Sequence, residues 1–344
     1  MVRMIELGLD TFGDVTLDEA GNPLPQHAVI RNVVEEAVLA DQLGLNFFGV
    51  GEHHRADFAV PAPDMVLAAI AARTKHIRLG SAVTVLSSDD PVRVYERFAT
   101  LDALSNGRAE VIVGRGSFIE SFPLFGFNLQ DYDLLFEERL HLFVELLKEK
   151  PVTWSGQTRA PLKAQEVYPR TADGIRTWVA VGGTPQSVVR AAHYGLPLML
   201  AIIGGSADRF APLANLYRQA LADGGKPAMP VGIHSPGHVA GTDEQAREEL
   251  FPYYEVMHNR IGGERGWPPL TRQGFEQMTG PHGALCVGSP ATVAAKIARA
   301  MIVLGAERFD LKYSNGAMPH ALLMKSIRLY GEEVVPRVRE LLKA

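Results

Sequence analysis

The sequence predicts a single-domain α/β protein built as a (β/α)8 TIM barrel. Short apolar runs of strand length alternate with longer segments whose apolar residues recur at helical spacing. Such alternation favours parallel strands, because each crossover needs a helix that covers the sheet. Eight units close naturally into a barrel, and 344 residues suit one. A doubly wound open sheet is less favoured, because no dinucleotide-binding glycine pattern follows the first run.

Eight apolar runs are the expected strands, and the segments between them are the expected helices. The expected strands are residues 5–9, 47–50, 77–85, 109–113, 177–181, 198–203, 231–233 and 309–311. In the first helical segment, Val29, Val33 and Ala37 fall on one face. Gly44 and Gly107 follow helical segments, where glycine readily takes the left-handed conformation of a helix end.

Two segments interrupt this alternation. Residues 151–176 are polar and rich in turn residues, so a small insertion such as a hairpin is expected there. Residues 259–283 are rich in glycine and proline, which predicts a long loop that is either disordered or an active-site lid. Both are interpreted as insertions in one domain spanning residues 1–344.

The composition excludes several classes of function. The net charge is −5, so no basic surface indicates binding to nucleic acid or anionic lipid. Cys286 is the only cysteine, which excludes an internal disulfide and a cysteine-cluster metal site. No apolar run reaches the roughly 18 residues of a membrane span, and no signal peptide is recognisable. The default expectation is a cytoplasmic protein.

Polar side chains follow several expected strands. In a parallel barrel the carboxyl ends of all strands lie on one face, so these residues should converge. Glu52, His53 and His54 follow the second strand, and Arg115 lies between two glycines after the fourth. Later strand ends contribute His234, Lys312, Ser314 and Asn315.

The fifth strand leads into a sequence typical of an anion-binding helix start. Gly182 and Gly183 let backbone amides approach a ligand, Thr184 suits the N-cap and Pro185 the first helical position. Free amides and the positive helix end would then bind a phosphate, with Ser187 as a further donor. When the segment is considered alone, an ordinary capped helix is the favoured interpretation.

Three other observations limit the chemistry. Arg115 is suited to pair with a phosphate at the same face, although a solvated loop arginine is an equal alternative. His53 and His54 are adjacent rather than three or four residues apart, so a metal site is disfavoured. No Gly-x-Ser-x-Gly motif follows a strand, which argues against a serine hydrolase. A phosphate-bearing organic cofactor with a histidine acting by hydrogen bond or proton transfer fits best.

Four motifs occur in a characteristic order and spacing. They are Gly-Glu-His-His at 51–54, Leu-Gly-Ser-Ala-Val-Thr-Val-Leu at 79–86 with Pro-Val-Arg at 91–93, Leu-Asp-Ala-Leu-Ser-Asn-Gly-Arg at 101–108, and Gly-Arg-Gly at 114–116. Together with the tail at 330–336, they resemble the bacterial luciferase-like, flavin-dependent monooxygenases over nearly the whole chain.

The resemblance implies positions for the flavin ring and its phosphate. The family has a non-proline cis peptide bond beside the ring, which corresponds here to Ala82–Val83, and Thr84 and Leu86 are expected to line the pocket. The phosphate ligands correspond to Arg115, Gly182, Gly183, Thr184 and Ser187. Luciferase itself has an acidic residue where this chain has Gly183.

The resemblance also implies the catalytic residue. His53 corresponds to the catalytic histidine near the reactive edge of the flavin, and Glu52 is expected to support the site from behind. Gly114 replaces the cysteine that some members carry near the flavin, so no thiol chemistry is expected.

The implied activity is that of a two-component monooxygenase. A separate reductase would supply reduced FMN, oxygen would add at the flavin C4a carbon, and the resulting peroxyflavin would oxygenate a small organic substrate. A homodimer is also implied. Two alternatives remain open: an F420- or FMN-dependent oxidoreductase that transfers hydride without oxygen, and a non-catalytic subunit that stabilises a catalytic partner.

Overall fold

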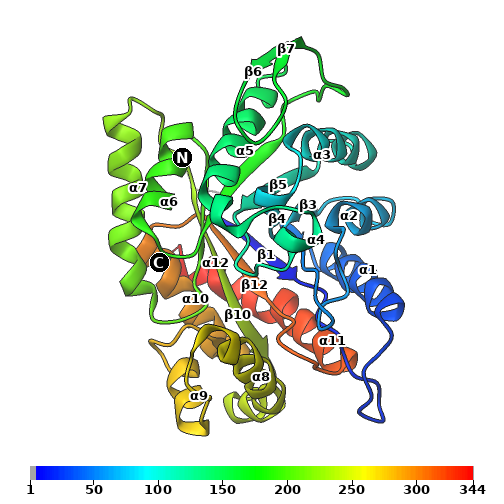
Figure 1. Cartoon of the computed structure of the whole chain (residues 1–344). Coiled ribbons are helices and arrows are strands. Elements are labelled where there is room, and N and C mark those ends of the chain that lie inside the picture. Colours follow the sequence, from blue (N-terminus) through cyan, green and yellow to red (C-terminus); the bar gives the residue numbers. More distant parts are fainter. Residues whose placement is uncertain (1–4, 344) are drawn as a thin grey trace.

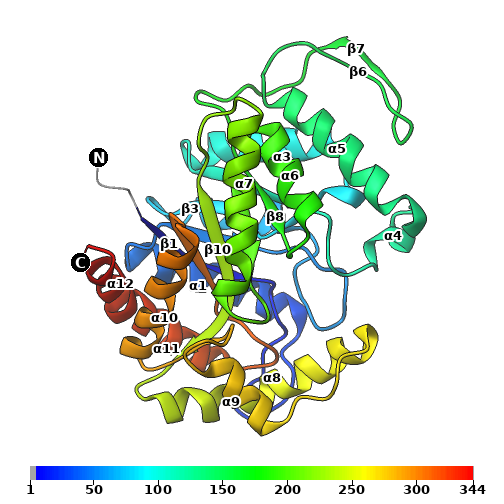
Figure 2. The ribbon, with the colours of Figure 1, turned by 90° about the vertical axis from the view of Figure 1, so that its left-hand side faces the viewer.

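The computed structural model describes residues 5–343. Within this range, eight parallel strands close into a barrel that is surrounded by helices (Figures 1 and 2). The barrel strands are β1 (Glu6–Thr11), β2 (Phe47–Val50), β3 (Arg78–Ser81), β5 (Ala109–Gly114), β8 (Arg176–Val181), β9 (Leu198–Ala201), β10 (Val231–Val239) and β12 (Arg308–Lys312). Each pairs with the next, and β12 pairs with β1, which closes the barrel. The predicted (β/α)8 barrel is confirmed.

Helices cover the outward-facing side chains of the strands. Because successive strand residues point to opposite faces, Leu7 and Leu9 of β1 are buried in the outer core between barrel and helices. The surrounding helices are α1 (Gln26–Gln42), α2 (Pro63–Ala71), α3 (Pro91–Ser105), α5 (Tyr132–Leu146), α6 (Pro185–Tyr194), α7 (Ala211–Asp223), α10 (Pro290–Leu304), α11 (His320–Leu329) and α12 (Val335–Leu341). None of the helices in residues 5–343 is long and apolar enough to cross a membrane.

The inside of the barrel is layered. A separate apolar cluster fills its middle and consists of Phe47, Ile112, Trp178 and Met199. Nearer the carboxyl ends of the strands, the inward positions Gly114, Ala180 and Ala201 carry small side chains or none. The middle layer therefore closes the barrel, and the small residues leave space above it.

The expected strand at 77–85 is interrupted. It is divided into β3 and β4 (Thr84–Val85), and the bond between Ala82 and Val83 at the break is cis. The non-proline cis bond that the family resemblance implied is confirmed, but the single continuous strand was wrong. The alternating apolar sequence does not show the break, because both parts remain buried.

The segment at 151–176 contains the hairpin expected from its turn residues. Strands β6 (Val152–Trp154) and β7 (Leu162–Gln165) pair antiparallel in a two-stranded sheet outside the barrel. Figure 1 shows this hairpin at the edge of the molecule, beyond α5. The loop between β6 and β7 reaches the start of α3, where Nε of Arg159 donates to Asp90 at 2.7 Å.

The expectation of a structureless loop at 259–283 was wrong. Helix α8 (Asp243–Arg265) covers the first residues of this segment, and α9 (Arg272–Thr279) follows after a short connection. Gly262 lies inside α8 and allows close packing, because a Cβ there would lie 3.1 Å from the Cβ of Trp267. Strand β10 is also longer than the expected 231–233, since its second half pairs with β11 (Cys286–Gly288).

Candidate active site

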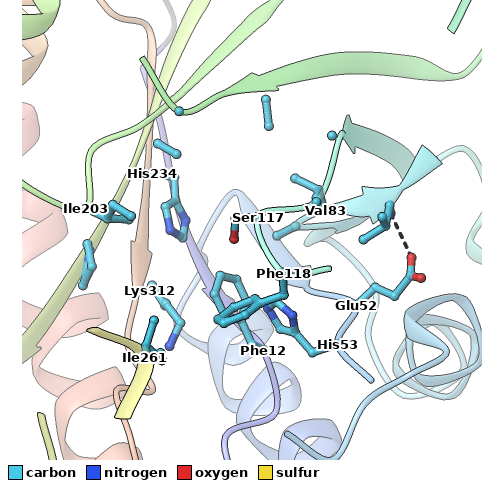
Figure 3. A pocket seen from close by; sticks show the side chains of 18 of the residues that line it. Phe12, Glu52, His53, Val83, Ser117, Phe118, Ile203, His234, Ile261 and Lys312 are labelled. Atoms are coloured by element: carbon cyan, nitrogen blue, oxygen red, sulfur yellow. Dashed lines mark hydrogen bonds between the residues drawn. The ribbon is translucent and has the colours of Figure 1, made fainter. Parts of the chain in front are cut away.

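A cavity of about 550 Å³ lies at the carboxyl ends of the barrel strands (Figure 3). Its size is typical of small-molecule and cofactor sites. The predicted site residues that line it are Glu52, His53, Ala82, Val83, Arg115, Gly182 and Ser187. Gly183 and Thr184 form the turn that leads into α6 and are not among the lining residues. The strand-end residues predicted to converge thus largely do so.

His53 lies among aromatic rings. The centroids of Phe12, Phe58 and Phe118 are 4.7, 4.5 and 4.9 Å from the centroid of its imidazole. Its backbone N–H donates to the carbonyl of Val60 at 3.1 Å, which positions the residue after β2. No hydrogen bond of the imidazole nitrogens is formed with any residue in 5–343, so they are free for a ligand.

The surroundings keep His53 uncharged. Burial, together with the positive charges of Lys312 and Arg55, lowers the pKa of His53 to about 3. At neutral pH the imidazole therefore has one N–H donor and one free lone pair. It is suited to hydrogen bonding or to the transfer of one proton, and not to a permanent positive charge.

Glu52 connects the end of β2 to the break between β3 and β4. One carboxylate oxygen accepts from the backbone N–H of Val85 at 2.9 Å, and the other is 3.0 Å from Nε2 of His54. The Glu52 backbone N–H donates to the Val83 carbonyl at 3.3 Å. Glu52 thus holds the segment that contains the cis bond and also positions His54, which agrees with its predicted supporting role.

The Ala82–Val83 bond forms part of the cavity wall. Gly114 on β5 gives the Val83 side chain its space, because a Cβ at Gly114 would lie 2.8 Å from a Val83 methyl group. The prediction that Thr84 and Leu86 line the cavity was wrong: Leu86 packs in the outer core, and Val85 lines the cavity. Because the strand is broken at Ala82–Val83, the residues after the break do not continue the alternation of the first part. The sequence pattern therefore did not show that Val85 faces the cavity.

The start of α6 has the geometry of an anion site. Thr184 is the N-cap, Pro185 is the first residue, and the Thr184 hydroxyl donates to Oγ of Ser187 at 2.8 Å. Gly183 has φ +124°, a conformation that side chains rarely allow. A Cβ on Gly182 would meet no heavy atom within 4 Å, so there is open space beside the turn. A phosphate in that space would face free amides and the positive helix end.

Arg115 lies at the same end of the cavity. Its guanidinium donates to Asp133 at 2.8 Å and lies 5.2 Å from the ring centroid of Tyr132. The Asp133 side chain is 74% exposed, so this ion pair is weak and a bound phosphate would compete with it. Arg115 is therefore available to an anion, although it is not aimed at one in this conformation.

The carboxyl-terminal end of α8 closes one side of the cavity. Glu264 accepts two hydrogen bonds from Arg55, at 2.6 and 2.8 Å, close to His53. Arg265 donates to the Ser117 carbonyl at 3.0 Å and lies 4.8 Å from the ring centroid of Phe118. The side chains that α8 and the following turn add to the wall are Tyr254, Met257, His258, Ile261, Arg265 and Trp267.

Sequence reasoning missed several lining residues. Asp10 and Phe12 follow the first apolar run, and their place at a strand end could have revealed them. Phe118 lies in the loop after β5 and gives no comparable signal. No group of three or more histidine, cysteine, aspartate or glutamate side chains within residues 5–343 has the arrangement of a metal site.

Comparison with known sequences is consistent with this geometry. A family model described as luciferase-like monooxygenase matches residues 11–308. The uncharacterized protein y4vJ of Sinorhizobium fredii is 25% identical, over 91% of this chain and 93% of its own length. The 4-hydroxyprotoasukamycin monooxygenase of Streptomyces nodosus subsp. asukaensis is 28% identical, over 69% of this chain and 66% of that protein. An F420-dependent glucose-6-phosphate dehydrogenase of Intrasporangium calvum is 28% identical, over 73% and 74%.

Solved structures show the same fold. The monooxygenase RslO1 from Streptomyces bottropensis superposes with a TM-score of 0.83 at 24% identity, covering 96% of this chain and 99% of RslO1. The oxygenating constituent of 3,6-diketocamphane monooxygenase from Pseudomonas putida, in complex with FMN, has a TM-score of 0.77 at 17% identity, covering 97% and 99%. With a family match over most of its length and a cavity at the expected face, this chain belongs to the luciferase-like monooxygenase family of oxidoreductases.

Proposed function

We propose that this protein is the oxygenase component of a two-component monooxygenase that uses reduced FMN and O₂ to oxygenate a small organic substrate. The observation that carries the proposal is a single cavity with two distinct ends. One end holds a neutral histidine among aromatic rings, and the other holds the start of α6 beside Arg115. A flat ring joined to a phosphate matches both ends.

The chain's own residues fit such a cofactor. The small side chains at Gly114, Ala180 and Ala201 leave space for a flat ring, and Ala82–Val83 would support one face of it. At the other end, backbone amides of α6, the Ser187 hydroxyl and Arg115 would hold the phosphate. The open space beside Gly182 and the φ of Gly183 both belong to this binding turn.

When bound, the reduced flavin supplies the electrons that activate molecular oxygen. In the proposal, His53 is the catalytic residue and uses its neutral imidazole to hold or transfer one proton at the reacting edge. The rings of Phe12, Phe58 and Phe118 exclude water from that proton. The end of α8 acts as a lid that closes over them.

Two partners follow from this assignment. Residues 5–343 form one barrel and a small hairpin, so the proposal requires a separate reductase to provide the reduced flavin. A relative of the same fold is named as the oxygenating constituent of its system, which supports this arrangement. The family resemblance further supports a homodimer.

A cofactor titration tests the proposal. The purified protein would be titrated with oxidised FMN, reduced FMN and F420, and the reduced complex would then be mixed with oxygen. We expect preferential binding of reduced FMN and a lag before the absorbance of oxidised flavin returns. The wild-type protein with reduced FMN but without substrate should release hydrogen peroxide.

Each other outcome identifies an alternative. Preferential binding of F420 would overturn the proposal and favour hydride transfer, the activity class named for the Intrasporangium calvum relative. Binding of no flavin at all would favour a non-catalytic subunit. Immediate reoxidation of bound FMN without any lag would favour an FMN enzyme that does not oxygenate.

A further inference from the structure

A second histidine lies in the cavity wall opposite His53. His234 on β10 has its Nδ1 2.7 Å from Oδ2 of Asp10 on β1, and both residues are buried. Its ring stacks on Phe12, with centroids 5.9 Å apart and an angle of 11° between the planes. Figure 3 shows Phe12 between His234 and His53. The two histidines therefore face different parts of the cavity.

Asp10 determines which nitrogen of His234 faces the ligand. An ionised carboxylate only accepts hydrogen bonds, so in the neutral imidazole this contact places the proton on Nδ1 and the free lone pair on Nε2. No residue in 5–343 forms a hydrogen bond with this Nε2. His234 lines the cavity, and an imidazole held in this tautomer by a carboxylate is the usual arrangement of a proton acceptor.

One carboxylate oxygen of Asp10 has no hydrogen-bond partner within residues 5–343. Its Oδ1 is buried without a hydrogen-bond partner among the described residues, and Asp10 itself is 1% exposed. Buried polar atoms are nearly always paired in folded proteins, so this oxygen has the capacity to accept a further hydrogen bond. A carboxylate with spare negative charge stabilises the imidazolium that His234 would become after accepting a proton.

The other charged groups around the pair have partners of their own. On β12, Asp310 is in register with His234, and Lys312 is in register with Asp10. Asp310 is paired with Arg308, which also binds Glu110, and burial raises the pKa of Asp310 to about 7. Lys312 is held by Asp14 and by the Ser314 carbonyl. The neighbouring positions on β2 and β9 are Gly49 and Ala201, which carry no charge.

We propose that Asp10 and His234 form a proton-accepting pair that ionises the hydroxyl of a phenolic substrate. The O–H bond breaks, the proton bonds to Nε2 of His234, and the electron pair stays on the substrate oxygen. His234 is the catalytic residue of this step, and Asp10 is a positioning residue. The inference rests on the proposed function in taking this phenol to be the molecule that is oxygenated.

The acidity of the hydroxyl decides which class of ligand the pair can ionise. A carboxylic acid would arrive already ionised and would have no proton to give to His234, and an aliphatic alcohol is too weak an acid for imidazole. A phenol, with a pKa of about 10, lies between these limits and can be shifted into range by a nearby base. Phe12, Ile203 and Ile261 provide apolar contacts for its ring (Figure 3).

The test uses the full-length protein and 4-nitrophenol, whose ionised form is coloured. We expect the pKa of the bound probe to fall by about one unit or more, as next to an opposite charge. This shift should be lost in His234→Gln and reduced in Asp10→Asn. The exposed His193→Gln is the matched control, and 4-nitroanisole, which has no acidic proton, should bind without a colour change. Circular dichroism of each variant establishes that it is folded. If His234→Gln does not fold, His234→Asn is measured in its place.

Three results would overturn the inference: no binding of 4-nitrophenol, binding without a change in its pKa, or an unchanged shift in His234→Gln. Displacement of the probe by FMN would also overturn it, since the flavin would then occupy the pair. The measurement needs neither flavin nor oxygen. A failure of the FMN titration with intact ionisation of the probe would therefore contradict the proposed function alone.

Discussion

At the level of single residues, the state of His53 follows from what surrounds it. Three aromatic rings remove water from the imidazole, and the positive charges of Lys312 and Arg55 oppose protonation. Removal of water disfavours the charged form of any histidine. The same rings would protect a reactive oxygen species from water, so one local arrangement serves both the neutral state and the chemistry.

This state predicts a pH dependence of stability. The folded pKa of His53 is about 3, below the value of about 6.5 for an unfolded chain, so the unfolded state binds the extra proton between these limits. The contribution of His53 to the free energy of unfolding is fully present above about pH 6.5. It is lost as the pH falls towards 3, by up to about 1.4 kcal/mol per pH unit. Urea unfolding of wild type and His53→Asn at several pH values should show a smaller loss in the variant. Parallel curves would contradict the low pKa.

His53 should also control the outcome of turnover. With reduced flavin and oxygen, we expect His53→Ala to lower product formation by about 100-fold or more, as for loss of an acid–base group. Binding of FMN should change less than about threefold, because the phosphate end is intact. Product and hydrogen peroxide would be measured together. An unchanged ratio of product to peroxide would show that His53 has no role in the oxygenation step.

Among single residues, the sequence predicted best where a motif and a strand end coincided. His53, Glu52 and Arg115 were found in this way, and all three line the cavity. Asp10 is not found from the sequence because the first apolar run stops at Leu9, although Asp10 still belongs to β1. Whether its side chain faces inward depends on the register of the closed barrel, which no local pattern shows.

At the level of elements, the start of α6 has the clearest separate role. Its free amides, Gly183 turn and Ser187 hydroxyl lie at one end of the cavity. A hydrogen bond to a charged group contributes about 1.5–3 kcal/mol, so Ser187→Ala should weaken FMN binding by about 10- to 100-fold. Gln186→Ala, one residue earlier and exposed, is the control. Equal affinities for the two variants, measured by calorimetry, would place the phosphate elsewhere.

The end of α8 is the proposed lid, and its closure depends on ion pairs. Glu264→Gln removes the pairing with Arg55 beside His53. The Glu264 side chain is 49% exposed, so stability should change by less than about 1 kcal/mol. Easier opening should instead raise the peroxide formed per substrate consumed severalfold. The control is Glu248→Gln, also on α8, which breaks a similar pair with Arg272 of α9. The same peroxide yield in both variants would contradict the lid.

The helical structure of 259–283 shows the limit of prediction by composition. Gly262 is buried inside α8, where it makes room for Trp267. In the sequence, the same glycine indicates a loop. A glycine chosen for close packing and one chosen for flexibility are identical in sequence, and only the tertiary contact distinguishes them.

At the level of the whole molecule, the barrel was predictable because each of its eight strands must bury apolar side chains against a helix. Every strand presents apolar residues such as Leu9 or Leu311 to a helix, which produces the apolar runs. The interior carries no such signal. Its charged residues, including Glu110 and Arg308, alternate with the outward ones and pair only when the barrel closes.

The buried ion pairs near the amino-terminal end of the barrel provide a last test of the closed architecture. Arg308 on β12 is fully buried, bonds to Glu110 across the barrel and to Asp310 beside it, and lies 3.7 Å from the ring centroid of Phe47. Arg308→Met leaves Asp310 without its partner and Glu110 with only Arg176, at 3.5 Å. We expect a loss of about 3–5 kcal/mol in the free energy of unfolding.

Replacing the whole group should reverse most of this loss. In the triple variant Arg308→Met, Glu110→Leu and Asp310→Leu, no buried charge lacks a partner, and well-packed apolar replacements of ion pairs are often neutral or stabilising. Denaturant unfolding of the two variants beside wild type measures the difference. If the triple variant were as unstable as Arg308→Met alone, the loss would come from packing against Phe47 and not from unpaired charge. The ion pairs would then accompany barrel closure without accounting for its stability.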